Sequence, residues 1–153
     1  MRRVYTTAVL TLFAAGAVQA QAPAINWGPA PAVFPVGARM AVLQGDPGKP
    51  GLFTVRLELP DGYKVAPHTH PTEEEITVIK GTFLLGMGDK MDAAKATKLP
   101  AGAFSSVEAN MHHYAIARGQ TVVQVHAMGP FVLTYVNPAD DPSKAVSKDK
   151  DHE

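Results

Sequence analysis

The chain has 153 residues, enough for one domain and short for two. Its formal net charge is zero, so the composition gives no basis for binding nucleic acid or an anionic membrane surface. The absence of cysteine excludes disulfides and thiolate ligands. Thirteen glycines and thirteen prolines predict many turns and favour an all-β domain over a helical bundle.

Residues 1–20 have the pattern of a secretory signal peptide. Arg2 and Arg3 give a positive start, an uncharged apolar run follows, and small residues precede two candidate cleavage sites, after Ala20 and after Ala22. The apolar run is too short for a comfortable membrane span. We therefore expect a periplasmic or secreted protein that has no membrane contact once the signal is removed. An amphipathic N-terminal helix is the alternative.

Residues 21–37 contain four prolines, which exclude a regular helix and a central strand. We predict an extended, proline-rich arm that lies over the domain. The only tryptophan, Trp27, lies in this arm. Its expected role is to pin the arm to the body by burying its ring, and stacking on a substrate is the alternative.

Short strands separated by turns are predicted over residues 38–136. The pattern is clearest in 52–59, where apolar residues occupy every second position and so share one face. Further strands are expected at 38–44, 76–80, 82–87, 103–107, 113–117, 121–128 and 131–136. Many short strands with close turns indicate a small barrel or sandwich. Residues 137–153 are polar and charged, and we predict a disordered tail there.

The stretch from Gly62 to Gly81 combines two histidines with a run of three glutamates. His68 and His70 are two residues apart, so in a strand their side chains point to the same face. Glu74 shares their parity and Glu75 does not, provided that the strand continues through the proline in between. Two imidazoles and a carboxylate on one face are typical of a transition-metal site. The alternative is an exposed histidine pair beside a solvated acidic patch, a match that short motifs often give by chance.

Two adjacent histidines, His112 and His113, supply candidates for a third ligand. Only one of them can face the interior from a strand. His113 shares its side with Ala115 and Ala117, whose small side chains leave room for a metal and a molecule bound to it. We therefore predict His113 as the third histidine and place His112 at the rim.

The stretch from Gly62 to Gly81 resembles the first motif of the cupin family. That motif is a glycine, five residues, His-x-His, three residues, a glutamate, six residues and a second glycine, and every position is present. The resemblance implies a single jelly-roll-like β-barrel over residues 38–136. It also implies one divalent transition metal inside the barrel. The ligands implied are His68, His70, Glu74 and His113.

The second cupin motif is matched only in part. Gly102 and His113 stand at the expected separation. Glu108, Asn110 and Ala117 stand where the family usually has Pro, Gly and Asn. These departures affect the turn before the histidine more than the ligand itself.

The ligand set suits Fe, Mn, Ni, Zn or Cu, and it leaves positions open for water, substrate or dioxygen. The resemblance implies an enzyme of the oxygenase or isomerase type that acts on a small organic molecule. The alternative is a non-catalytic cupin that binds a metal or a small ligand. The sequence leaves open whether the chain forms a homodimer.

A polar group in the cavity opposite the metal would favour the enzyme. Gln124 and His126 share one parity on the apolar strand at 121–128, and they are the predicted substrate-pocket residues. A histidine satisfied within the core is the alternative for His126.

Overall fold

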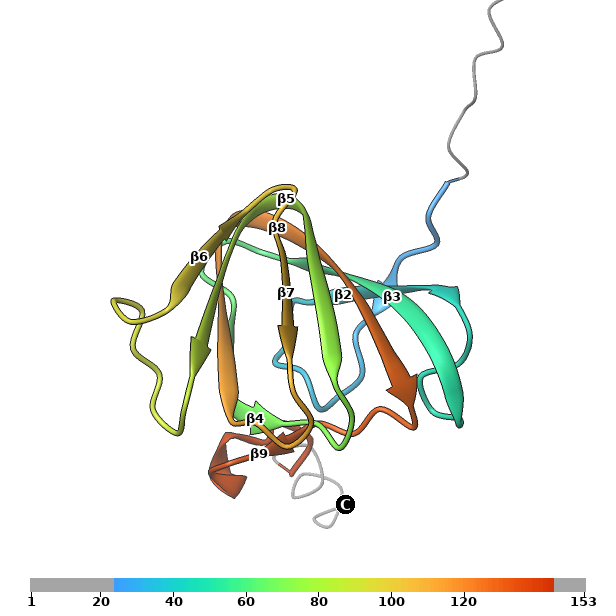
Figure 1. Cartoon of the computed structure of the whole chain (residues 1–153). Coiled ribbons are helices and arrows are strands. Elements are labelled where there is room, and N and C mark those ends of the chain that lie inside the picture. The colour runs from blue at the N-terminus through green and yellow to red at the C-terminus, as the bar shows by residue number, and fades with distance from the viewer. Residues whose placement is uncertain (1–23, 145–153) are drawn as a thin grey trace, which may run out of the picture.

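The computed structural model describes residues 24–144. The predicted signal peptide and the last nine residues of the predicted tail lie outside the described residues. Within the described part, nine strands form one sheet that curls around an interior (Figure 1). None of the described helical segments is long and apolar enough to cross a membrane. The predicted all-β barrel is confirmed.

The strands differ greatly in length. In chain order they are β1 (Gly28–Pro29), β2 (Arg39–Gln44), β3 (Gly51–Leu59), β4 (Lys64–Thr69), β5 (Glu74–Met87), β6 (Thr97–Pro100), β7 (Phe104–Val107), β8 (His113–Gly129) and β9 (Thr134–Tyr135). A short 3-10 helix, η1 (Pro138–Asp140), follows. β5 unites the strands predicted at 76–80 and 82–87, and β8 unites those at 113–117 and 121–128. The strand predicted at 131–136 is reduced to β9.

β8 connects the two halves of the barrel. Its first part lies antiparallel to β4 and to the end of β5. Its second part lies between β3 and the start of β5. β5 also changes neighbours, from β7 near its start to β6 near its end. Both long strands therefore bend, and the sheet closes around the interior (Figure 1).

The bend of β5 lies at Gly81, where the pairing register with β8 shifts. Gly81 has φ +79°, a left-handed conformation that favours glycine. A Cβ here would also lie 2.5 Å from the carbonyl oxygen of Gln120 and 2.7 Å from the hydroxyl of Thr121. This close approach explains why the second glycine of the first cupin motif is needed.

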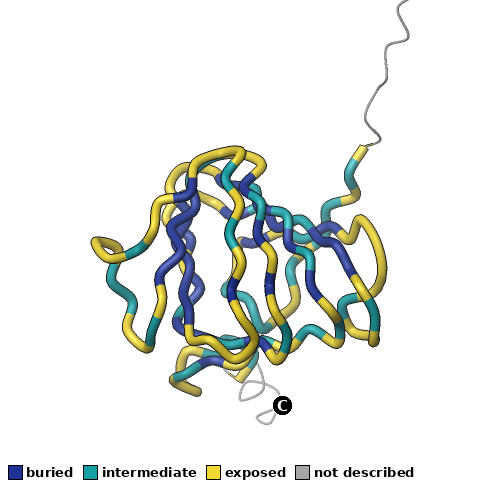
Figure 2. The backbone as a smooth tube through the Cα atoms, in the orientation of Figure 1, coloured by how far each residue is buried: buried dark blue, intermediate teal, exposed yellow. Residues whose placement is uncertain are grey.

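Buried and exposed residues alternate along several strands (Figure 2), and most of the buried residues are aliphatic or aromatic. On β3 the predicted inward set is buried, with Phe53 at 0% and Leu59 at 2% exposure. β8 places Val123 and Val125 opposite them, both nearly fully buried. Burial of each such side chain stabilises the fold by about 1.5–3 kcal/mol.

The proline-rich arm is attached to the barrel. β1 pairs with β2, which adds the arm to one edge of the sheet. The hydroxyl of Tyr135 donates to the carbonyl of Val33 at 2.8 Å, and that of Tyr63 donates to the carbonyl of Pro35 at 2.6 Å. The two bonds hold the arm on both sides of Phe34.

Trp27 packs on the outside of the barrel edge. It is half-buried, and the guanidinium carbon of Arg39 lies 5.7 Å from its ring centroid. A cation above the face of an aromatic ring is attracted to it, so this contact helps to fix the arm.

Residues 137–144, the described part of the predicted tail, contain local hydrogen bonds. The Asn137 side chain accepts a hydrogen bond from the amide of Ala139 at 3.1 Å, and the Asp141 side chain accepts one from the amide of Ser143 at 3.0 Å. Asn and Asp side chains stabilise such turns locally, without large apolar residues. Both hydrogen bonds join residues two positions apart, so they define local turns.

Candidate metal centre

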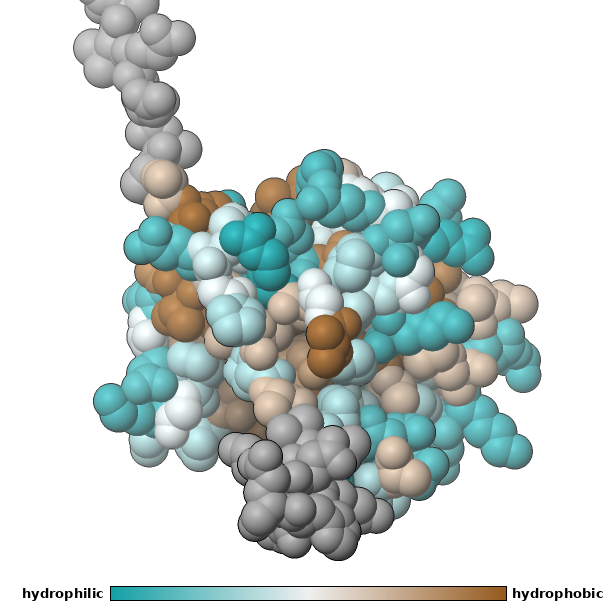
Figure 3. Space-filling view, turned by 180° about the vertical axis from the view of Figure 1, so that it is seen from behind, coloured by the Kyte–Doolittle hydropathy of each residue, from teal (hydrophilic) through white to brown (hydrophobic). Residues whose placement is uncertain are grey.

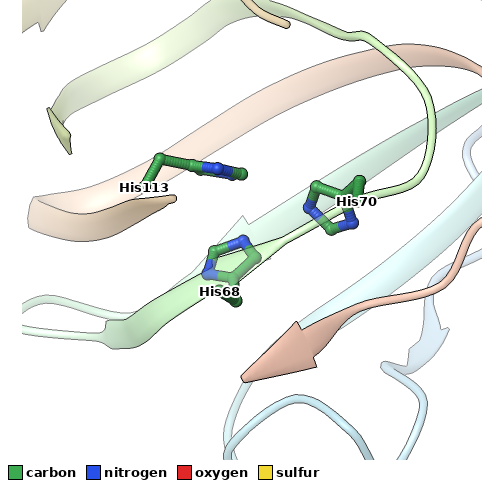
Figure 4. A group of neighbouring side chains, drawn as sticks. All are labelled: His68, His70 and His113. Carbon is green, nitrogen blue, oxygen red and sulfur yellow. The ribbon is translucent and has the colours of Figure 1, made fainter. Parts of the chain in front are cut away.

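The two halves of the predicted site come together at one end of the barrel. His68 lies on β4, His70 just after it, and His113 at the start of β8. β4 and β8 pair so that His68 lies opposite His113. The three rings point toward one another (Figure 4).

The three histidines form a compact, buried group. Their exposures are only 4%, 4% and 2%, and candidate ligand atoms of all three lie within 4.8 Å of one another. Nitrogens that share one ion at about 2.1 Å can be at most about 4.2 Å apart. Small adjustments of the rings therefore suffice to enclose an ion.

Each ring is oriented by a hydrogen bond from its Nδ1 to a backbone carbonyl. The pairs are His68 with Ala66 at 2.7 Å, His70 with Val132 at 2.8 Å, and His113 with Met111 at 3.0 Å. A carbonyl can only accept, so in the neutral ring Nδ1 carries the proton and Nε2 keeps its lone pair. Metal-binding histidines are commonly held in this way.

The Nε2 atom of His113 is buried and has no hydrogen-bond partner in the described structure. The nearest acidic oxygen, Oε2 of Glu74, lies 3.3 Å away, and it lies 3.8 Å from Nε2 of His70. A lone pair that faces a carboxylate without a proton between them is unfavourable in a buried site. A cation in this space would satisfy both groups, so the residues present fit a metal ion.

The protonation states match this interpretation. Burial, together with the nearby His113 and His70, lowers the pKa of His68 to about 3. Burial also lowers the pKa of His70. For Glu74, burial alone would raise the pKa, but the contact with His113 and the proximity of His70 and His68 lower it. At neutral pH His68 and His70 are thus neutral imidazoles next to a carboxylate.

The histidines and Glu74 open onto a small cavity, the metal cavity, of about 30 Å³. This is room for about two water-sized molecules. The rest of its described lining is aliphatic or phenylalanine, including Leu59, Ile76 and Phe83. These side chains exclude water and offer no further proton donor or acceptor.

Comparison with known proteins gives a family match over most of the chain. Residues 15–134 match the family described as "Domain of unknown function (DUF4437)". The chain belongs to the DUF4437 family. Curated proteins give no significant match.

Solved structures similar to this DUF4437 protein include cupins. A proposed acetylacetone dioxygenase from Methylibium petroleiphilum PM1 is 27% identical, with a TM-score of 0.59 over 77% of this chain and 79% of that one. The polyketide cyclase RemF from Streptomyces resistomycificus is 17% identical, with a TM-score of 0.63 over 80% and 87%. An RmlC-like cupin from Shewanella frigidimarina NCIMB 400 is 15% identical, with a TM-score of 0.53 over 69% and 86%. The last two show a shared fold alone. The cupin fold that the sequence resemblance implies is therefore confirmed.

Glu74 faces the interior of the barrel, but not because it shares a strand with His68, as the parity argument assumes. β4 ends at Thr69 and the chain turns, so Glu74 belongs to another strand from His68. Glu74 faces inward because it alternates with Glu75 on β5, where Glu74 and Ile76 are buried and Glu75 is exposed.

The adjacent histidines have different surroundings in the structure. His113 is buried in the group, whereas His112 is exposed and its ring contacts Asp89. The turn before them contains Asn110 with φ +63°, at the position where the second cupin motif usually has glycine. Asparagine tolerates this left-handed conformation, so the departure from the motif preserves the turn.

The prediction that Gln124 and His126 face the cavity is wrong. In this part of β8 the cavity is lined by Val123 and Val125. These valines alternate with Gln124 and His126 along the strand, so the two pairs point to opposite faces. In the sheet His126 pairs with Glu75 rather than with Glu74, so it lies on the other face. The face depends on the register between β5 and β8, which the parity within a single strand does not provide.

Several groups that shape the site have no signal in the sequence. The three carbonyls that orient the rings belong to ordinary apolar residues. Phe131 stacks on the ring of His70, with centroids 4.1 Å apart and planes at 19°. The position of Phe131 depends on the loop between β8 and β9, so only the folded structure shows this contact.

Proposed function

We propose that this protein is an exported, metal-dependent cupin that oxidises a small, mostly apolar molecule with dioxygen. The ligands proposed for one divalent transition metal are His68, His70, His113 and Glu74. The observation that carries the proposal is the buried Nε2 of His113. It has no hydrogen-bond partner among residues 24–144, and it faces a carboxylate in a cavity that is otherwise mostly apolar.

The residues of the chain prepare the site in three ways. The backbone carbonyls hold the Nε2 lone pairs of the rings toward one point. Glu74 contributes a negative charge that partly offsets a divalent cation. The apolar lining excludes bulk water, which strengthens electrostatic interactions inside. When bound, the metal would supply Lewis acidity and, if redox-active, a route to dioxygen chemistry.

The lining favours an oxygenase over an isomerase. An isomerase that moves protons needs a titratable side chain within reach of the substrate. In the described lining, the proposed ligands are the only titratable groups, and Gln124 and His126 lie on the other face. The protein's own residues can therefore bind and orient an apolar substrate but supply no separate acid or base.

The substrate class follows from the same lining and from one similar structure. No cationic side chain lines the described cavity, which disfavours polyanions. The similar protein from Methylibium is named for acetylacetone, a small 1,3-dicarbonyl whose remainder is apolar. We propose 1,3-dicarbonyls as the first class to test.

Metal analysis and oxygen uptake test this function. The protein is loaded separately with Fe, Mn, Ni, Zn or Cu, and oxygen consumption is followed with a panel of 1,3-dicarbonyls. We expect about one bound metal per chain and uptake with at least one redox-active metal. His113→Ala should abolish both, while the neighbouring His112→Ala should retain both. Metal binding without uptake on the whole panel would refute the oxygenase.

A non-catalytic metal-binding cupin is the second candidate. The small volume of the metal cavity favours it, because about 30 Å³ holds an ion and little else. It predicts tight metal binding in wild type, with no substrate-dependent change in oxygen uptake.

Export is proposed from the N-terminal pattern alone. N-terminal sequencing of protein from the periplasm or medium should find a chain that begins after Ala20 or Ala22. A chain that still begins at Met1 would contradict export by a cleaved signal.

A further inference from the structure

A second apolar cavity adjoins the metal cavity. It measures about 210 Å³, and we call it the side compartment. Four side chains line both spaces: Phe34, Leu57, Val125 and Leu133. One layer of side chains therefore separates the side compartment from the metal cavity.

The metal cavity alone is too small for an organic substrate. Its volume of about 30 Å³ admits about two water-sized molecules, whereas pockets for drug-sized ligands measure roughly 300–1,000 Å³. The side compartment adds about 210 Å³, and its described lining contains no charged side chain. It suits an alkyl group rather than a polar one.

Phe34 is the part of this wall that is best placed to open. Leu57 and Val125 lie within paired strands, so their positions are fixed by the sheet. Phe34 belongs to the arm, and its amide donates to the carbonyl of Pro31 at 2.8 Å. The carbonyls on either side of it accept hydrogen bonds from Tyr63 and Tyr135. Because the backbone is held, rotation of the half-buried ring is the simplest way to join the two spaces.

The outer surface offers a weaker candidate for ligand binding. Its large exposed apolar side chains, such as Phe104 at 59%, Leu52 at 55% and Met87 at 51%, come from three different strands. On the face shown in Figure 3, hydrophobic residues form small separate groups rather than one continuous patch. Larger hollows lie beside Met87 and Asp89 and beside Glu108, but they are more open than the side compartment and have charged residues in their lining.

We propose that the side compartment binds the apolar tail of the substrate, and that Phe34 sets the length of tail that the enzyme accepts. The substrate class is a 1,3-dicarbonyl that carries an alkyl chain, with its oxygens toward the histidines and its chain toward Phe53 and Val55. This inference rests on the proposed function for the identity of the polar end. The binding of an apolar group in the side compartment can be tested separately.

Xenon tests the side compartment without any turnover. Crystals of the metal-loaded protein are pressurised with xenon, which binds apolar cavities of this size. We expect a xenon site between Phe34 and Phe53 in wild type. Met40→Trp should remove it, since Met40 lines the side compartment but not the metal cavity. Absence of xenon from this place in wild type would overturn the proposal.

Substrate series test the role of Phe34. Oxygen uptake is measured with pentane-2,4-dione and with homologues that carry one to four more methylenes. Phe34→Ala should raise kcat/KM for the longest homologue, relative to pentane-2,4-dione, by roughly tenfold or more. Met40→Trp should lower the same ratio by a similar factor. Phe104→Ala, the same truncation on the exposed face of β7, should leave the ratio unchanged.

The outcomes separate this inference from the proposed function. If wild type, Phe34→Ala and Met40→Trp all turn over substrate with the same preference for chain length, the inference about the side compartment is overturned. The proposed oxygenase function would stand in that case. If no protein consumes oxygen, the oxygenase fails, and calorimetric titration with the same homologues decides the inference. Affinity that rises with chain length in wild type but not in Met40→Trp would support it, and a flat series in both would refute it.

Discussion

His113 and His126 lie on the same strand, β8, but on opposite faces, and they differ in burial and in the pairing of their ring nitrogens. On the outer face, both ring nitrogens of His126 have partners: Nδ1 lies 2.8 Å from the hydroxyl of Thr54, and Nε2 lies 3.1 Å from the side-chain nitrogen of Gln124. On the inner face, the Nδ1 of His113 has a partner, whereas its Nε2 is buried and has no hydrogen-bond partner within the described part of the chain.

This difference separates a structural histidine from a ligand candidate. A buried polar atom without a partner costs about 1–3 kcal/mol, so folded proteins rarely retain one that has no function. His126 belongs to a chain of paired side chains that continues to Arg56, whose Nε donates to Gln124 at 3.0 Å. The residue type is the same in both places, and the pairing of the ring nitrogens distinguishes them.

The largest expected effect is on metal-dependent stability. A metal that binds only the native state stabilises it by about 4 kcal/mol at a thousand-fold excess over Kd. We therefore expect EDTA to lower the Tm of metal-loaded wild type at neutral pH. In His113→Ala, EDTA should have almost no effect, whereas in His126→Ala it should act as in wild type. The comparison between the two faces fails if His126→Ala also removes the EDTA effect.

The next effect concerns the carboxylate. Glu74→Gln keeps the shape of the side chain but removes its charge, so we expect metal affinity to fall by roughly 10–100-fold. Glu75 lies one residue away on the outer face of β5, and Glu75→Gln should leave the affinity unchanged. Competition with a fluorescent chelator measures both. Equal losses in the two variants would mean that a long-range charge effect, rather than coordination by Glu74, is responsible.

Low pH should destabilise the metal-free protein. Burial lowers the pKa of His68 from its ordinary 6.5 to about 3 in the native state. Between these values the unfolded chain binds a proton that the native state does not, so the free energy of unfolding falls as the pH falls. From pH 7 to pH 5 we expect His68 to contribute a loss of about 2 kcal/mol. Urea unfolding of wild type and His68→Leu measures this loss, and identical pH slopes would contradict it.

The smallest effect is expected on the outer face. His126→Ala removes a hydrogen bond to Thr54, so the free energy of unfolding should fall by about 1 kcal/mol while metal content stays constant. Urea unfolding and metal analysis of the same preparation test both parts. Loss of metal without loss of stability would reverse the roles assigned to the two faces.

The placement of residues can be predicted from the sequence where the information is local. The His-x-His spacing brings His68 and His70 together, and parity on one strand separates the buried His113 from the exposed His112. Sequence reasoning failed for Gln124 and His126, because their face depends on the register between distant strands.

The lengths of the long strands were missed for a related reason. Glycines at positions 81 and 119 suggest turns. In the structure the pairing register between β5 and β8 shifts where the sheet bends, and each of the two continues as a single strand. The two cavities next to Phe34 were also beyond prediction, because their walls come from the arm, β3, β8 and the loop before β9.

The pairing of β8 with distant segments has a consequence for the order of events during folding. Gly51 pairs with Gly129, and His68 pairs with His113, so both ends of β8 depend on contacts far apart in the sequence. Topologies of this kind fold slowly, in roughly milliseconds to seconds. The entropy cost of closing a long loop is incurred before the stabilising contacts between distant strands can form. The three rings cannot converge before β8 has docked on β4. The ion should therefore be captured by a barrel that is already closed, and the refolding rate should be independent of metal concentration while the unfolding rate falls as metal is added.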